Sequence, residues 1–320
     1  MRRVLFQLAS LLFAVICGAE ETSHVATPMR LDYYAFRRWD KQEKPDPAAL
    51  QTLSIAIFFD PLVPDAAGHL KVDDAFVAGL AHLKAMKAPK TEIWLGLGSL
   101  STVMGNEAAM GTLGKDVAAL CAQHGFAGVD IDWENADVSA EAYKAAVEHI
   151  VAAVKPHRIR VSVSHGMGAT FVKRTEAVAE LVDLVNIQAY YSLGNSCSVE
   201  AVAKRLDAYI RAGVPARKIC LGLPVYGMLD MAANREAKSK TVSYRDILAK
   251  GGSPTANQWT NPGNGLTYHY SGLPLIAEKV EYAKRSGFAG VFTWEMTCDT
   301  PYAEPNSLLR RIDRSLGLTP

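Results

Sequence analysis

Short apolar runs rich in β-branched and aromatic residues alternate along this chain with longer amphipathic stretches. Eight of the runs are predicted to be strands: Leu31–Phe36, Leu53–Phe59, Thr91–Leu97, Gly128–Trp133, Ile159–Ser164, Leu184–Tyr190, Cys220–Tyr226 and Gly290–Trp294. The stretches between them predict helices, among them Asp73–Lys87, Ser139–Val154, Ser198–Ala212 and Pro274–Lys284. In Ser139–Val154, for example, apolar residues recur at three- and four-residue spacing, which is typical of a helix that packs on a core.

Strands that alternate with helices predict parallel pairing through right-handed crossovers. The strand count and the length of 320 residues fit an α/β fold of the (β/α)8 TIM-barrel type. A doubly wound open sheet fits the same alternation, but it usually carries a glycine-rich phosphate loop after its first strand, and Tyr33–Arg38 is nothing like one. The long gap from Tyr226 to Gly290 predicts a short insertion between strand 7 and strand 8, with a helix at Ser243–Lys250.

The first residues have the layout of a cleavable secretory signal peptide. Arg2 and Arg3 precede the apolar run Val4–Ile16, which is too short for a comfortable membrane span. We expect residues 1–19 to be the signal peptide and residues 20–320 to form one domain. The mature protein is then expected to be secreted or periplasmic, without a membrane attachment.

Composition and cysteine content limit the possible partners. The formal net charge of +1 and the apolar share of 49% do not point to nucleic acid, whereas a neutral polysaccharide is compatible with them. We expect a monomer. Cys121 and Cys220 lie in apolar patterns and are predicted to be buried thiols, whereas Cys197 and Cys298 each follow a strand and are the candidates for a disulfide. No spacing predicts a zinc site, and no metal or organic cofactor is expected.

The candidate chemistry lies in the run Gly128–Glu134, where Asp130, Asp132 and Glu134 are two residues apart. In a strand such residues share one face, so the three acids would form a single file. Like charges at this spacing repel, so at least one acid should remain protonated near neutral pH, as a general acid requires. The alternative is an exposed edge strand with a solvated acidic face, which the large apolar residues between the acids disfavour.

The run Ala127–Glu134 resembles the DGxDxDxE signature of glycoside hydrolase family 18, the chitinase family. Ala127 stands where the family has its first Asp, which leaves the tuning of the site open more than its chemistry. The resemblance implies that Glu134 acts as general acid and then as base, and that Asp132 orients the 2-acetamido group of the substrate. It also implies that Asp130 shares a proton with Asp132.

The resemblance extends to strands six and eight. It implies that the hydroxyl of Tyr190 bonds the acetamido oxygen, that Gln188 contacts sugar or carboxylate, and that Trp294 stacks on a sugar ring. Tyr191 occupies a position that is often Asp or Asn in the family, so its contact with sugar hydroxyls stays open. For Tyr190 and Trp294 the alternative is plain core packing.

The family also lines its cleft with aromatic residues at the ends of strands one and two. Tyr34 and Phe58 are the residues that we assign there, with core packing as the alternative.

On this resemblance, the chain is predicted to be a retaining, substrate-assisted glycosidase that hydrolyses β-1,4-linked N-acetylglucosamine in chitin or chito-oligosaccharides. An endo-β-N-acetylglucosaminidase and a peptidoglycan hydrolase share the need for an acetamido group and remain alternatives. A non-catalytic chitin-binding lectin is the alternative from another class; such relatives typically lose the catalytic acid, which is present here as Glu134.

Overall fold

The protein is built around a closed barrel of parallel strands in the order β1-β12-β7-β6-β5-β4-β3-β2. The computed structural model describes residues 28–39, 45–135, 137–190, 198–229 and 241–318. The barrel strands are β1 Met29–Tyr34, β2 Ile55–Leu62, β3 Glu92–Leu97, β4 Gly128–Ile131, β5 Arg160–His165, β6 Leu184–Ile187, β7 Ile219–Pro224 and β12 Gly290–Trp294. Pairing of β1 with β12 closes the barrel, which confirms the TIM-barrel prediction and excludes the open sheet.

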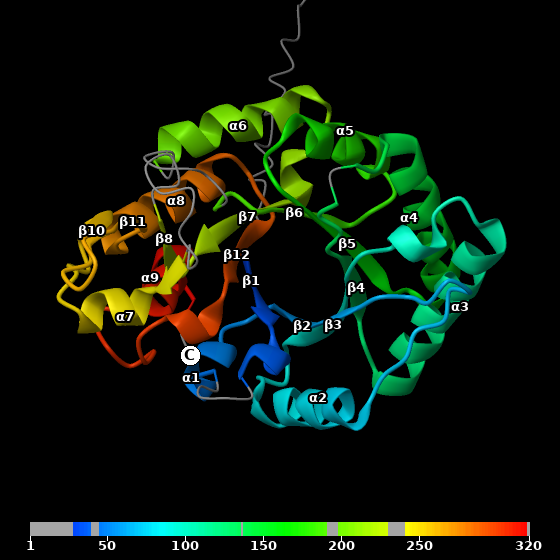
Figure 1. Ribbon diagram of the computed structural model, residues 1–320, viewed down its shortest axis with the longest axis horizontal. Coiled ribbons are helices and arrows are strands. Elements are labelled where there is room, and N and C mark those ends of the chain that lie inside the picture. Colours follow the sequence, from blue (N-terminus) through cyan, green and yellow to red (C-terminus); the bar gives the residue numbers. More distant parts are fainter. Residues whose placement is uncertain (1–27, 40–44, 136, 191–197, 230–240, 319–320) are drawn as a thin grey trace, which may run out of the picture.

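Helices surround the barrel on its outside (Figure 1). The α-helices are α1 Pro47–Leu50, α2 Asp74–Met86, α3 Glu107–His124, α4 Ala140–Val154, α5 Ala169–Val178, α6 Val199–Arg211, α7 Tyr244–Ala249, α8 Leu273–Arg285 and α9 Leu308–Leu316. Short 3-10 segments are η1 Phe36–Trp39, η2 Ser101–Val103, η3 Lys155–His157, η5 Ala216–Lys218 and η6 Met296–Cys298. Ser139 and Ser198 cap α4 and α6 by accepting a backbone N–H, which explains where these helices begin.

The insertion between β7 and β12 is present at the predicted place. It contains β8 Tyr226–Leu229, β9 Thr241–Ser243, β10 Gln258–Thr260 and β11 Thr267–His269, which pair antiparallel in the order β10-β11-β8-β9. Helix α7 confirms the helix predicted at Ser243–Lys250. In Figure 1 this unit lies beside the barrel, next to α8.

Alternation along the strands divides the apolar core in two. Inside the barrel lie Leu31, Tyr33, Trp94 and Phe292, while the next residues along the strands pack outward against the helices. Gly128 makes room for Trp94, because a Cβ at this position would lie 2.2 Å from the indole Cδ2.

Buried charges hold the barrel closed at β1. Arg30 donates to Asp32 at 2.5 Å and to Asp313 of α9 at 2.8 Å, and all three side chains are buried. Asp32 in turn accepts the backbone N–H of Thr293 in β12 at 3.1 Å. The first and last strands and the last helix are therefore joined by one hydrogen-bonded network.

Within the described residues, no helix is both long and apolar enough to span a membrane. The predicted signal peptide lies outside these residues.

Candidate functional site

The three acids of the predicted file differ in depth. Strand β4 ends at Ile131, so Asp130 lies within the strand and Asp132 and Glu134 lie past its carboxyl end. Asp130 is completely buried, Asp132 is half-buried and Glu134 is exposed. The file therefore runs from the barrel interior to the mouth, where TIM-barrel enzymes place their catalytic groups.

The buried carboxylate of Asp130 is surrounded by donors. It accepts hydrogen bonds from the hydroxyls of Ser162 (2.6 Å), Tyr33 (2.9 Å) and Ser164 (3.1 Å) and from the Nδ2 of Asn186 (3.0 Å). Burial raises the pKa of Asp130, and these hydrogen bonds oppose that shift because they favour the charged form. Asp130 thus supports the site from below.

Asp132 is the acid whose pKa is shifted most clearly by its surroundings. Burial raises its pKa well above the ordinary value, and the negative charges of Asp130 and Glu134 raise it further. The Nε2 of Gln188 donates to its Oδ1 at 3.0 Å, which fixes the carboxyl group. Repulsion within the file, the predicted cause, therefore contributes to this shift, and burial is the larger cause.

A cavity of about 380 Å³ opens at the mouth of the barrel. It is lined by Tyr33, Phe59, Gly98, Ser99, Asp132, Trp133, Glu134, Asn135, Gln188, Tyr190 and Trp294. The structure thus brings together five of the predicted residues, with Asp130 beneath them. Tyr191 lies outside the described residues.

The aromatic side chains form one wall of this cavity. The ring of Trp294 meets those of Tyr33 and Phe59 edge to face, with centroids 5.6 and 5.5 Å apart. Tyr190 packs against Phe292, with centroids 6.0 Å apart. A ring with apolar C–H faces, such as a pyranose, fits against a wall of this kind while its polar groups meet the carboxyl groups.

The assignment of Tyr34 and Phe58 to the cleft is wrong. Both are buried on the outer side of the barrel, where Phe58 stacks on Phe36 at 4.7 Å and the hydroxyl of Tyr34 bonds the Nδ1 of His82 at 2.6 Å. Because side chains alternate along a strand, the neighbouring Tyr33 and Phe59 point into the cavity instead. Both faces of these strands carry aromatic residues, so the sequence alone offers no signal for the choice.

Other residues that sequence reasoning missed did carry a signal. Ser162 and Ser164 in β5 are polar residues two positions apart in an otherwise apolar run, and Asn186 in β6 lies two positions before the predicted Gln188, which follows the strand. They have the same spacing as the acids and lie on the same inner face, so they supply the acids with hydrogen-bond donors.

The cysteines and possible metal ligands add nothing to this site. Cys121 and Cys220 are buried free thiols, as predicted, while Cys197 of the candidate disulfide lies outside the described residues. Within the described part of the chain, no cluster of His, Cys, Asp or Glu is arranged to hold a metal ion.

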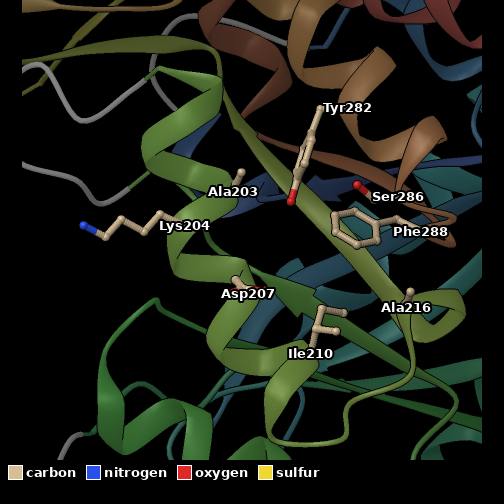
Figure 2. A pocket seen from close by; sticks show the side chains of 8 residues that line it. All are labelled: Ala203, Lys204, Asp207, Ile210, Ala216, Tyr282, Ser286 and Phe288. Carbon is tan, nitrogen blue, oxygen red and sulfur yellow. The ribbon is translucent and has the colours of Figure 1, made fainter.

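A second cavity, of about 420 Å³, lies on the outside of the barrel between α6 and α8 (Figure 2). Its lining residues are Ala203, Lys204, Asp207, Ile210, Ala216, Tyr282, Ser286 and Phe288. The one carboxylate there, Asp207, is paired with Arg211 on the same helix. This cavity lacks adjacent acids and contains none of the predicted residues, so the candidate active site is the one at the barrel mouth.

Comparisons with known proteins agree with this geometry. Residues 33–299 match the family model described as Glycosyl hydrolases family 18. The chain is 24% identical over 293 residues to Endochitinase 1 of Metarhizium robertsii, a match that covers 73% of this chain and 67% of that protein.

Two solved structures share the fold. The GH18 chitinase ChiB of Flavobacterium johnsoniae superposes with a TM-score of 0.74 at 21% identity, covering 91% of this chain and 94% of that one. A chitinase-like agglutinin from Robinia pseudoacacia gives a TM-score of 0.72 at 18% identity, covering 90% of this chain and 99% of that one.

Proposed function

Because the chain belongs to glycosyl hydrolase family 18, we propose that it is a retaining, substrate-assisted glycosidase that cleaves β-1,4-linked N-acetylglucosamine in chitin or chito-oligosaccharides. The observation that carries this proposal is the pairing of exposed Glu134 with a half-buried Asp132 of raised pKa in one cavity. A carboxyl group of raised pKa that is bound by Gln188 is poorly suited to be a nucleophile. It is well suited to hydrogen-bond an amide, and family 18 is one of the groups in which the substrate's acetamido group performs the attack.

The proposed reaction begins at the glycosidic oxygen. Glu134 donates its proton there while the acetamido carbonyl oxygen attacks the anomeric carbon, so that the leaving sugar departs as an alcohol and a cyclic oxazolinium ion forms. Asp132 orients the acetamido N–H and stabilises the positive charge, and the hydroxyl of Tyr190 donates to the acetamido oxygen. Glu134 then accepts a proton from water while the water oxygen attacks the anomeric carbon; the bond from that carbon to the acetamido oxygen breaks, which regenerates the acetamido group and restores the original configuration.

The remaining residues support that reaction. Asp130 shares a proton with Asp132, and its donors hold it in place below. Trp294 stacks on the sugar whose anomeric carbon reacts, and Gln188 holds Asp132.

The decisive experiment is fluorophore release from a chitobioside conjugate. Glu134→Gln should lower kcat by about 10²–10⁴-fold, because it removes the proton donor and keeps the shape of the side chain. Glu176→Gln, at an exposed glutamate of α5 outside the cavity, is the matched control and should retain full rate. Turnover near the wild-type rate in Glu134→Gln would refute the mechanism.

Two alternatives within the enzyme class share the acetamido requirement. Product analysis with chitin oligomers, an N-glycosylated protein and cell-wall sacculi separates a chitinase from an endo-β-N-acetylglucosaminidase and a peptidoglycan hydrolase. The agglutinin among the similar structures keeps a lectin as the alternative of another class. Calorimetric binding of chitin oligomers with no hydrolysis of any of these substrates would favour the lectin.

We also propose that the protein is exported by the segment 1–19 and acts as a monomer. Mass spectrometry of the amino terminus of the protein secreted by its host tests the cleavage, and retention of residues 1–19 would contradict it. Light scattering tests the monomer.

A further inference from the structure

A buried arginine lies directly behind the segment that carries Glu134. Arg174 of α5 is completely buried, and its Nε and Nη2 both donate to the backbone carbonyl of Val138, at 3.0 and 2.5 Å. Val138 is itself buried and lies four residues after Glu134, just before α4 begins. The only hydrogen bonds of this guanidinium within the described residues are therefore made to the connection between β4 and α4.

The surroundings of Arg174 give it little electrostatic compensation. Its guanidinium lies over the rings of Tyr143 (5.6 Å) and Phe171 (5.5 Å), and its Nη1 has no hydrogen-bond partner in the described structure. Within that same part of the chain it forms no ion pair, and Asp137 acts on it only at longer range. Burying a cation without a paired carboxylate is costly. The hydrogen bonds of Arg174 to the Val138 carbonyl offset part of this cost.

The other end of the connection is anchored separately. The backbone N–H of Asp132 donates to the carbonyl of Leu97 in β3 at 2.9 Å, and the buried ring of Trp133 packs against Tyr143 at 5.4 Å. Glu134 is exposed between these anchors and the Val138 carbonyl. Its position is thus defined by contacts on both sides, and Arg174 makes the hydrogen bonds to the Val138 carbonyl on the α4 side.

We propose that Arg174 is a positioning residue for the general acid. By holding the Val138 carbonyl, it keeps the Glu134 carboxyl group at the position from which it can transfer a proton to the glycosidic oxygen. This inference rests on the proposed function. Proton transfer depends on hydrogen-bond geometry, and a displacement of about 1 Å can lower a rate by about a hundredfold.

Arg174→Met is the direct test, because methionine can fill the space between Tyr143 and Phe171 but cannot donate to the carbonyl. We expect kcat on the fluorogenic chitobioside to fall by roughly ten- to a hundredfold while KM stays close to the wild-type value. Arg174→Lys retains one charged donor and should recover part of the lost kcat. It also decides the question if the methionine variant does not fold.

Lys218 supplies a matched control. Like Arg174, Lys218 makes two hydrogen bonds to backbone carbonyl oxygens: its Nζ donates to Ala179 (2.7 Å) and Val182 (2.9 Å). These contacts lie at the opposite end of the barrel, before β7. Lys218→Met therefore removes a comparable contact and should leave kcat unchanged. Thermal melts of both variants define a temperature at which each is folded for the comparison.

Hydrogen exchange of the amides in residues 132–135 and 137–139 gives a readout independent of turnover. Exchange should be faster in Arg174→Met than in wild type or Lys218→Met. Faster exchange together with reduced kcat supports the proposal; wild-type kcat in Arg174→Met overturns it, and so does unchanged exchange. If the wild-type protein hydrolyses no acetamido sugar, the proposed function fails, and exchange still reports whether Arg174 holds the connection.

Discussion

Replacing Asp130 by Asn should move the alkaline limb of the kcat–pH profile to lower pH. Burial is the main cause of the raised pKa of Asp132, and the negative charge of Asp130 is the next. Removing that charge lowers the pKa of Asp132, so Asp132 loses its proton at a lower pH than in wild type.

The size of the effect follows from the strand geometry. Residues two apart on a strand are separated by about 6–7 Å. Two unit charges at this distance interact by about 2.5 kcal/mol for an effective dielectric constant near 20. This energy changes the protonated fraction by up to roughly seventyfold, so kcat on the alkaline side should fall by about that factor while the acid side changes much less.

The substitution is expected to keep the fold. An Asn at position 130 can retain its oxygen toward Ser162 and Asn186, and the hydroxyls of Tyr33 and Ser164 can rotate to accept from its amide. Initial rates of fluorophore release from the chitobioside conjugate, measured across the pH range of activity, give the profile.

Asp32→Asn is the control, because it makes the same change at a buried strand aspartate that faces outward, where burial raises the pKa to about 6. It should lower stability without moving the limb. An alkaline limb that stays in place in Asp130→Asn would show that Asp130 carries no charge in the active enzyme, and the shared-proton reasoning would fail.

Two further predictions concern packing and the closure of the barrel. Gly222→Ala should lower kcat, because a Cβ there would lie 2.8 Å from the Cε1 of Tyr190 and 2.7 Å from the carbonyl oxygen of Ile187; unchanged steady-state kinetics would contradict this. Arg30→Met leaves two buried carboxylates without their cation, which costs about 3–5 kcal/mol and should lower the melting temperature by roughly 5–8 °C in a domain of this size. Differential scanning calorimetry measures that shift, and a melting temperature equal to that of wild type would exclude a stabilising role for the network.

The barrel and the acid file were predictable because both depend on short-range periodicity. Alternating strands and helices leave few topologies, and a two-residue spacing is the period of a strand. Asp132, Glu134 and Tyr190 therefore came together as expected. The ends of the strands were less predictable. Strand β4 ends at Ile131, two residues before its predicted end, and β6 ends at Ile187, three residues before its predicted end. Residues that follow these ends line the cavity.

The aromatic wall could not be predicted in the same way. Tyr33 and Tyr34 are neighbours of the same type, both are buried, and only the closed barrel decides which one faces inward. Arg174 was equally hidden, because it is one basic residue on a helix and its partner is a backbone carbonyl, which no sequence pattern marks. Contacts to the backbone and the choice between two apolar faces depend on tertiary structure alone.

Depth along β4 and the residues that follow it gives the three acids different tasks. In a strand, each step of two residues moves a carboxyl group about 6–7 Å while keeping it on the same face. Asp130 is buried among hydrogen-bond donors, Asp132 is half-buried beside two negative charges, and Glu134 is exposed to solvent at the mouth. Carboxyl groups repeated at one spacing thus acquire different surroundings, because the barrel is closed at one end of the file and open at the other.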